Sequence, residues 1–255
     1  MGERSAYAPG TFCWADVAGT DLEAQQRFYE QLLGWRAEVT PGGYWMLTLD
    51  GRSVAGMFEP PHEMPVPSWF SYVSVEDADA TAARARDLGA TVQIRPRDLG
   101  PPGVQVGRMA MIIDPQGAAV ALWQPGLHIG AQLVNDTGAM CWNVLSTSDV
   151  DAAASFYGEL FGWTLEPLEA LGEYWEIRTG AGGLNGGMTA LPEDGLPPHW
   201  QVIFTVPDAQ DAVRRAAALG GGEIAPPATT AIGDFAVVHD PAGASFAVFA
   251  GETDD

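Results

Sequence analysis

The chain has 255 residues and a formal net charge of −21 at neutral pH, and all twelve of its basic residues are arginine. Such an acidic surface repels phosphate backbones and anionic membranes, so we expect no nucleic-acid partner and no membrane partner. The absence of lysine excludes a Schiff-base lysine and a phosphate-loop lysine. A hydrophobic fraction of 47% and nine tryptophans exclude a disordered chain.

The first ten residues lack the apolar run of a signal peptide. Pro, Gly, Gln and His interrupt the long uncharged stretch between Asp114 and Asp136, so it is unsuited to a membrane helix. We therefore expect a cytoplasmic protein, long enough for two ordinary domains.

The first predicted strand, Phe12–Val17, alternates in the manner of a half-buried strand, with Phe12, Trp14 and Asp16 on one face. Asp21 then has the position of a helix N-cap, apolar residues recur at helical spacing, and Gly34 suits the left-handed residue that ends a helix. Two short strands follow, at Tyr44–Leu49 and Val54–Phe58.

A second unit begins with a strand that opens at Pro67. It continues with a helix over Asp77–Leu88, further strands, and the turn Asp114-Pro115-Gln116-Gly117, whose Asp and Pro fit a type I turn. A last strand ends at Trp123.

The remainder of the chain repeats this series of elements, because residues 10–38 return as residues 138–166. Rare residue types do not align at one offset by chance, so the repeat predicts a duplicated architecture. Because the two cysteines occupy equivalent places, two small buried side chains are favoured over one disulfide. The matched pairs are Cys13 with Cys141, Trp14 with Trp142, Asp21 with Asp149, Tyr29 with Tyr157, and Trp35 with Trp163.

The pattern β-α-β-β-β therefore occurs four times, grouped in two pairs. We expect an N-terminal tail over residues 1–9 and a C-terminal tail over residues 251–255. The two domains span residues 10–125 and 138–250, and residues 126–137 link them.

This arrangement resembles the vicinal oxygen chelate superfamily, which includes glyoxalase I, extradiol dioxygenases and bleomycin-resistance proteins. The Cys-Trp-x-Asp opening is similar to tandem two-domain actinobacterial members of the glyoxalase-like type. The resemblance implies an α+β fold with two paired glyoxalase-like domains, in each of which a curled mixed sheet surrounds a cleft that holds the site. It is carried by Asp21, Phe28-Tyr29, Leu33-Gly34-Trp35, the turn at 114–117, and their counterparts in the second half.

The resemblance also identifies the positions at which metal-using members hold their ion. A divalent metal needs roughly three protein ligands of suitable type, and these positions keep almost none. We therefore expect no metal and no other cofactor. The positions are occupied by Trp14, Phe70 and Ala121 in the first half and by Trp142, Gln201 and Ala247 in the second.

Several residues are candidates for contact with a small molecule. Trp14 and Trp142, at family site positions, are either core aromatics or the floor of a pocket for an apolar or aromatic ligand. Gln201 is a polar candidate, and the remaining aromatic and methionine side chains suit packing or a pocket wall. These remaining candidates are Trp45, Trp69, Trp175, Trp200, Met57 and Met188.

Asp16 is the candidate catalytic residue. A carboxylate in an apolar cleft has a raised pKa and can serve as a general acid or base. The alternative is a hydrogen-bonded structural Asp at the end of a strand. Glu176 is a second polar candidate with a weaker case. The counterpart of Asp16 is Val144, so we expect the two halves to be unequal in function.

The leading hypothesis is metal-independent binding or conversion of a small apolar or aromatic molecule, by family analogy in specialised metabolism or resistance. As an enzyme, it would be a lyase, isomerase, cyclase or hydrolase that uses an acid/base carboxylate. The alternatives are a metal-dependent lyase or dioxygenase, and a non-catalytic protein that sequesters a drug or metabolite. The tandem repeat and the net charge favour a monomer or a weak homodimer.

Overall fold

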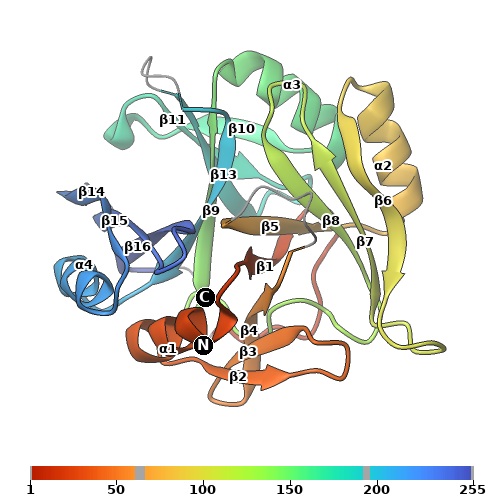
Figure 1. Ribbon diagram of the computed structural model, residues 1–255. Helices are drawn as coiled ribbons and strands as arrows, with labels where there is room; N and C mark the ends of the chain where they lie inside the picture. Colours follow the sequence, from red (N-terminus) through yellow and green to blue (C-terminus); the bar gives the residue numbers. More distant parts are fainter. Residues whose placement is uncertain (1, 61–66, 192–195, 254–255) are drawn as a thin grey trace.

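The computed structural model describes residues 2–60, 67–191 and 196–253. Two mixed sheets of eight strands each form the protein, one from each half of the chain (Figure 1). The first half consists of β1 (Phe12–Ala18), α1 (Leu22–Leu33), β2 (Arg36–Val39), β3 (Trp45–Leu49), β4 (Arg52–Phe58), β5 (Ser68–Ser74), α2 (Ala78–Asp87), β6 (Thr91–Leu99), β7 (Gly107–Ile113) and β8 (Ala119–Pro125). The second consists of β9 (Met140–Thr147), α3 (Val150–Phe161), β10 (Thr164–Pro167), a 3₁₀ turn (Glu169–Leu171), β11 (Tyr174–Arg178), β12 (Leu184–Ala190), β13 (His199–Thr205), α4 (Ala209–Ala218), β14 (Gly222–Thr229), β15 (Gly233–His239) and β16 (Ser245–Gly251).

The strand order in the first sheet is β2-β3-β4-β1-β5-β8-β7-β6, and the second sheet repeats it as β10-β11-β12-β9-β13-β16-β15-β14. Strands β1 and β5 pair antiparallel at the centre, while each pairs parallel with the last strand of its own unit. The predicted α+β fold of four βαβββ units is therefore confirmed. Strands β2 and β10 are short and largely exposed, which explains why no hydrophobic pattern marked them.

The predicted helix boundaries are confirmed. Asp21 begins α1 by accepting a hydrogen bond from the Ala24 backbone N–H at 3.0 Å, and Asp149 caps α3 in the same way. Both helices end at a glycine in the left-handed conformation, with φ of 80° at Gly34 and 73° at Gly162. No helix in the described part of the chain is long and apolar enough to cross a membrane.

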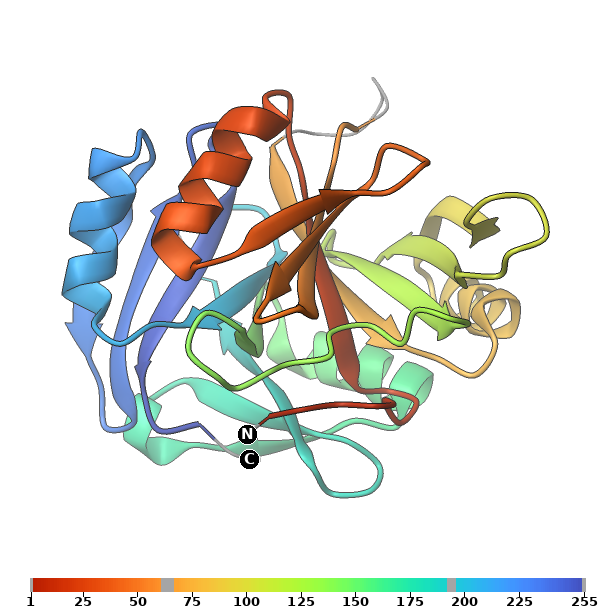
Figure 2. The same ribbon diagram turned by 90° about the horizontal axis from the view of Figure 1, so that it is seen from below.

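The helices bring the two halves together. Figure 2 shows α1 beside α4, and α2 lies beside α3 on the other side of the molecule. On α1, Phe28 packs against Phe246 of the second sheet with ring centroids 6.2 Å apart. Central strands β5 and β13 also contact each other. Each half therefore buries part of its apolar surface against the other.

The two predicted Asp-Pro turns connect the halves through buried carboxylates. One oxygen of Asp114 accepts three backbone N–H groups of its own turn, and the other accepts the Tyr157 hydroxyl of α3 at 2.9 Å. Asp240 repeats this turn and accepts the Tyr29 hydroxyl of α1 at 2.9 Å, and Gln25 adds a second donor at 2.5 Å. The predicted turn roles of both aspartates are confirmed.

A β-bulge changes which side chains share a face of β1. The pairing with β5 shifts between Phe12 and Trp14, so the partner of Phe12 is Val73 and that of Trp14 is Tyr72. Phe12 then packs on Trp200 of the second half at 4.9 Å between ring centroids. The expectation that Phe12 lies on the same face as Trp14 is therefore wrong, because the extra residue reverses the alternation.

The N-terminal segment, expected as a tail, pairs with the segment that joins the halves. The Arg4 N–H donates to the Gln132 carbonyl at 3.0 Å, and the Val134 N–H donates to the Gly2 carbonyl at 2.9 Å. A side chain at position 2 would meet the Val134 carbonyl oxygen at 1.6 Å, so this close approach requires glycine. Of the expected C-terminal tail, residues 254–255 lie outside the described residues.

Both cysteines are free, with Cys13 buried and Cys141 partly buried, as expected for two small packed side chains. Trp35 and Trp163 follow the helices and are nearly fully buried. Their indole N–H groups donate across the halves, to the carbonyls of Gly138 at 2.6 Å and of Gly10 at 2.7 Å.

We expect Tyr157→Phe to lower the free energy of unfolding by about 1.5–3 kcal/mol, because Asp114 loses a buried hydrogen bond to a charged group. The matched variant Tyr29→Phe removes the same kind of bond, but Gln25 still donates to Asp240, so its loss should be smaller. Urea unfolding of both variants measures the two losses. Equal losses, or none for Tyr157→Phe, would contradict the role given to these carboxylates.

Candidate functional site

The sheet register defines two faces of each sheet. Cross-strand partners share a face, so the face of the first sheet that carries Trp14 and Asp16 also carries Tyr72, Phe70 and Ala121. We call this the first site face. The equivalent face of the second sheet, the second site face, carries Trp142, Val144, Ile203, Gln201 and Ala247.

Asp16 lies at the centre of a buried hydrogen-bond group on the first site face. One carboxylate oxygen, Oδ2, accepts the hydroxyl of Tyr72 at 2.9 Å and that of Tyr44 at 3.2 Å. The Trp14 indole N–H donates to the Tyr44 hydroxyl at 3.0 Å. Tyr44 reaches this position because Gly56 has no side chain: a Cβ there would lie 1.7 Å from the Tyr44 oxygen.

The second carboxylate oxygen of Asp16, Oδ1, is buried and has no hydrogen-bond partner. The residue as a whole is 3% exposed. Burial raises the pKa of Asp16 to about 7, and the hydrogen bonds from Tyr72 and Tyr44 offset only part of that rise. An unpartnered buried carboxylate oxygen is costly when it is charged, and protonation of Asp16 lowers that cost.

The two phenols remain proton donors towards Asp16. Burial and the neighbouring Asp16 charge raise the pKa of both Tyr44 and Tyr72 well above the ordinary value. Both hydroxyls therefore keep their protons at neutral pH. They stabilise the ionised form of Asp16, while burial favours the protonated form, and the balance leaves the carboxyl able to exchange a proton near pH 7.

His128 closes one end of this aromatic group. Its ring stands edge-on to Trp14 with centroids 4.5 Å apart, and the Trp123 indole N–H donates to its carbonyl at 3.0 Å. Its Nε2 is buried without a partner, and burial lowers the pKa of His128 to about 4, so the ring is neutral. A cavity of about 500 Å³ lies against it, with Val106 and Leu127 also in the lining.

The second site face repeats the tryptophan–tyrosine hydrogen bond of the first and lacks the carboxylate. The Trp142 indole N–H donates to the Tyr174 hydroxyl at 2.7 Å, as Trp14 does to Tyr44. Val144 replaces Asp16, and Ile203 replaces Tyr72. The aromatic and aliphatic side chains here are in part only half-buried, so this face offers open apolar surface without an acid/base group.

Six of the sequence candidates lie on the opposite faces. Trp69 donates its indole N–H to the Tyr29 hydroxyl at 3.0 Å, and Trp200 donates to Tyr157 at the same distance, inside the core shared by the halves. The register places Trp45 and Met57 with Trp69, and Trp175 and Met188 with Trp200. These six residues therefore do not share a site with Asp16, because neighbouring residues of a strand point to opposite faces.

The remaining candidates divide between the two site faces. Trp14 and Asp16 both bond to the Tyr44 hydroxyl. Trp142 and Gln201 lie on the second site face, where Gln201 accepts a hydrogen bond from the Ser245 hydroxyl at 3.3 Å. Glu176 lies on the same face but its carboxylate pairs with Arg178 at 3.0 Å.

The site faces do not fit the metal that some relatives of the fold hold. In the described residues, no group of three or more His, Cys, Asp or Glu side chains could hold an ion. The first site face presents one carboxylate whose Oδ2 is already bound by two protonated phenols. Indole, phenyl and methyl groups, which do not coordinate a divalent metal, occupy all the family ligand positions except that of Gln201, and one amide oxygen is fewer than the roughly three ligands such an ion needs.

Sequence reasoning missed Tyr44, Tyr72 and His128. Tyr44 could have been found from the repeat, because a tyrosine, Tyr174, occupies the equivalent position in the second half. Tyr72 has no tyrosine counterpart, and His128 lies in the joining segment, so neither carried a sequence signal.

The sequence is similar to a known domain family and to proteins of known name. The model of the glyoxalase-like domain family matches the chain twice, over residues 14–123 and 142–249. The chain is 40% identical over 258 residues to a Mycobacterium tuberculosis protein provisionally named glyoxylase CFP32, an alignment that covers 97% of each. It is 34% identical over 267 residues to the anthracycline biosynthesis protein DnrV of Streptomyces peucetius, covering 95% of this chain and 94% of that protein.

Solved structures share the fold at low identity. The Mn(II)-bound glyoxalase from Novosphingobium aromaticivorans superposes with a TM-score of 0.66 at 14% identity, covering 97% of this chain and 84% of that one. The 2,3-dioxygenase LapB from Pseudomonas sp. KL28 gives 0.65 at 17%, covering 98% and 96%. These likenesses extend over the whole architecture and say nothing of the reaction.

The raised pKa of Asp16 predicts a specific dependence of stability on pH. The ordinary value is 3.8 and the folded value about 7, so the folded state binds the proton more tightly than the unfolded chain. This contribution is complete below the ordinary value and is lost as the pH rises through about 7. Relative to Asp16→Asn, the wild-type free energy of unfolding should fall by on the order of 4 kcal/mol between about pH 4 and about pH 8. Urea unfolding at both pH values measures it, and a constant difference would contradict the burial of an unpaired carboxyl.

Proposed function

Because the chain belongs to the family of glyoxalase-like domains, within the vicinal oxygen chelate superfamily, we propose that its first site face binds a small apolar or aromatic molecule and that Asp16 exchanges a proton with it. The observation that carries the proposal is the buried, unpartnered Oδ1 of Asp16. No protein-held metal takes part in the proposed reaction. The reaction type is a lyase, isomerase, cyclase or hydrolase step that needs a general acid or base.

The surroundings of Asp16 support an aromatic ligand. Trp14, Phe70 and Tyr72 are buried around the carboxyl and give it an aromatic environment of low polarity, which suits an aromatic ligand. At one end, the neutral His128 adds a ring nitrogen, Nε2, that has no hydrogen-bond partner. The similarity to a protein of anthracycline biosynthesis agrees with an aromatic substrate in specialised metabolism.

Proton exchange at Asp16 follows from its two oxygens. Oδ2 is held by the phenols of Tyr72 and Tyr44, which fix the plane of the carboxyl. Oδ1 is then left to accept a proton from an acidic C–H or O–H of the ligand, or, when protonated, to donate one to a carbanionic or enolate carbon or to an oxygen of the ligand. A pKa of about 7 for Asp16 lets the same group act in either direction near neutral pH.

Two alternatives predict different results. A metal-dependent lyase or dioxygenase agrees with the solved structures of the fold, but it lacks side chains to hold the ion on the described site faces. A sequestering protein would use the same aromatic surface without proton exchange. The similarity to a protein provisionally named a glyoxylase favours the enzyme readings over sequestration.

We expect Asp16→Asn to lower kcat by about 10²–10⁴-fold on a substrate found by screening polycyclic aromatic ketones and phenols. Asn keeps the shape of Asp and cannot exchange the proton, so ligand affinity should stay within several-fold. The readout is turnover together with calorimetric affinity, and Val144→Asn on the second site face is the matched control. Full turnover by Asp16→Asn would end the assignment.

Metal content gives an independent test of the same proposal. Protein purified without added metal should contain far less than one equivalent of Fe, Zn, Ni or Mn per domain by elemental analysis, and chelation should leave turnover unchanged. One tightly bound ion per domain, held by protein side chains, would favour the metal-dependent alternative. Calorimetry should also give one strong ligand site per chain, because Val144 cannot replace Asp16.

A further inference from the structure

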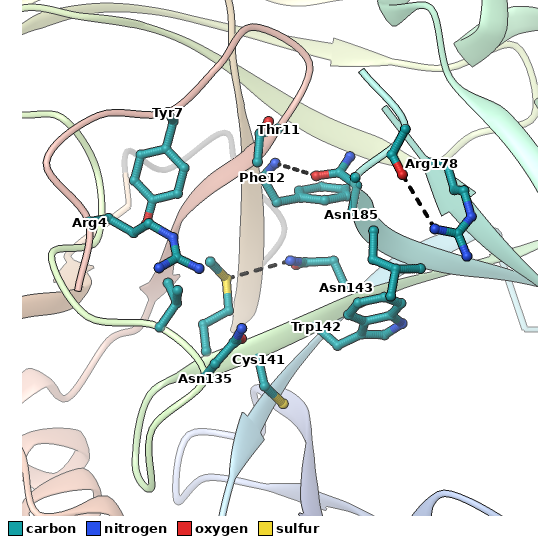
Figure 3. A pocket seen from close by; sticks show the side chains of 15 residues that line it. Arg4, Tyr7, Thr11, Phe12, Asn135, Cys141, Trp142, Asn143, Arg178 and Asn185 are labelled. Carbon is teal, nitrogen blue, oxygen red and sulfur yellow. Dashed lines mark hydrogen bonds between the residues drawn. The ribbon is translucent and has the colours of Figure 1, made fainter. Parts of the chain in front are cut away.

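A second cavity, also of about 500 Å³, lies where the N-terminal segment crosses the second sheet (Figure 3). Its volume is in the range of small-molecule sites. Nothing in the proposed reaction at Asp16 uses it. Its lining includes Arg4, Thr11, Phe12, Trp142, Asn143 and Leu184.

The charges around this cavity differ from those of the chain as a whole. The chain has 33 acidic and 12 basic residues, yet two arginines and no aspartate or glutamate are among the described residues that line the cavity. Arg178 is neutralised by Glu166 and Glu176. Within the described residues, the Arg4 guanidinium donates to the Glu3 carbonyl oxygen and pairs with no carboxylate.

The position of Arg4 is fixed by its backbone. Its N–H donates to the Gln132 carbonyl at 3.0 Å, and the nearby Tyr7 hydroxyl donates to the Ala131 carbonyl at 2.7 Å. The pairing of residues 2–4 with the joining segment therefore places the backbone of Arg4 beside the cavity that its side chain lines.

Asn143 supplies a second donor from the opposite wall, on β9. It is 1% exposed, and its Oδ1 accepts the Ser71 hydroxyl at 2.6 Å. Its amide nitrogen donates only to the Met140 sulfur at 3.5 Å in the described structure, and a thioether is a weak acceptor. Figure 3 shows Arg4 on the side of the N-terminal segment and Asn143 across from it. The cavity thus has a guanidinium without a carboxylate partner in the described residues and an amide N–H without a strong acceptor.

The other walls are apolar. Phe12 is buried on one side, Trp142 is half-buried at the edge towards the second site face, and Leu184 is 37% exposed. Ring and aliphatic surfaces beside a guanidinium suit a flat apolar molecule with one anionic end.

We propose that this cavity binds a small aromatic carboxylate, with Arg4 and Asn143 holding the carboxylate and with Trp142 and Leu184 contacting the rings. The site is separate from Asp16 and does not depend on the reaction proposed there. It exists only when the N-terminal segment is in place, because Arg4 belongs to that segment.

A matched pair of probes tests the charge requirement on the full chain. Calorimetry at low ionic strength compares 2-naphthoate with the neutral 2-naphthamide. We expect the acid to bind at least about tenfold more tightly than the amide, which corresponds to a charge-assisted contact. A protein with a net charge of −21 repels anions in general, so this preference requires a local cation. Equal affinities, or no binding of the acid, would overturn the proposal.

Two variants locate the binding site. Arg4→Gln should weaken 2-naphthoate binding about tenfold or more and leave the amide unchanged. Its control, Arg27→Gln, removes one positive charge from an exposed helical pair and should have no effect. Leu184→Trp should block the cavity for both probes, and Ile232→Trp, at a similarly exposed position elsewhere, should not. Unchanged acid binding in Arg4→Gln, an equal loss in Arg27→Gln, or loss of acid binding in Asp16→Asn would each overturn the assignment.

Discussion

The architecture depends on two buried carboxylates, each satisfied jointly by its own turn and by the other half of the chain. Asp114 and Asp240 are at most 4% exposed, so the oxygens of each need hydrogen-bond donors from the protein in place of water. The turn backbone supplies three, and a tyrosine from the opposite half's helix supplies the next. Each tyrosine in turn accepts an indole N–H from a central strand, Trp200 or Trp69. These Trp-Tyr-Asp series of hydrogen bonds place each helix against the sheet of the other half. They also bury one face of the central strands in the core that the two halves share.

Because the shared core occupies one face, chemistry is confined to the other, where duplication has allowed divergence. The frame is kept in both halves: a tryptophan donates to a tyrosine hydroxyl that lies over a glycine. What differs is the group inside the frame, Asp16 in one half and Val144 in the other. Replacing Tyr72 by Ile203 removes the second phenol along with the carboxylate it would bind. The two site residues thus differ together between the halves, while the residues that form the scaffold stay the same.

Sequence reasoning succeeded where the determinants are local. Helix caps, terminal glycines and the Asp-Pro turns are set by a few adjacent residues, and the repeat doubled each signal. It failed where the answer depends on register or on the path of a distant segment. The bulge after Phe12 puts that side chain on the other face of β1, and no residue type in the sequence indicates it. Trp69 and Trp14 are the same residue type, and only their positions within their strands place them on opposite faces of the sheet. His128 joins the aromatic group through the course of the joining segment, which no periodicity describes.

The exchange of helices between the halves has a consequence for synthesis of the chain. Tyr29 of α1 needs Asp240, a partner 211 residues later, and Phe28 packs on Phe246. Translation delivers about 5–20 residues per second, so α1 leaves the ribosome many seconds before the surface that buries it exists. The first half therefore spends that interval with an apolar helix face uncovered. The two glyoxalase-like repeats are separate units of descent, yet the ribosome must release nearly the whole chain before either can complete its fold.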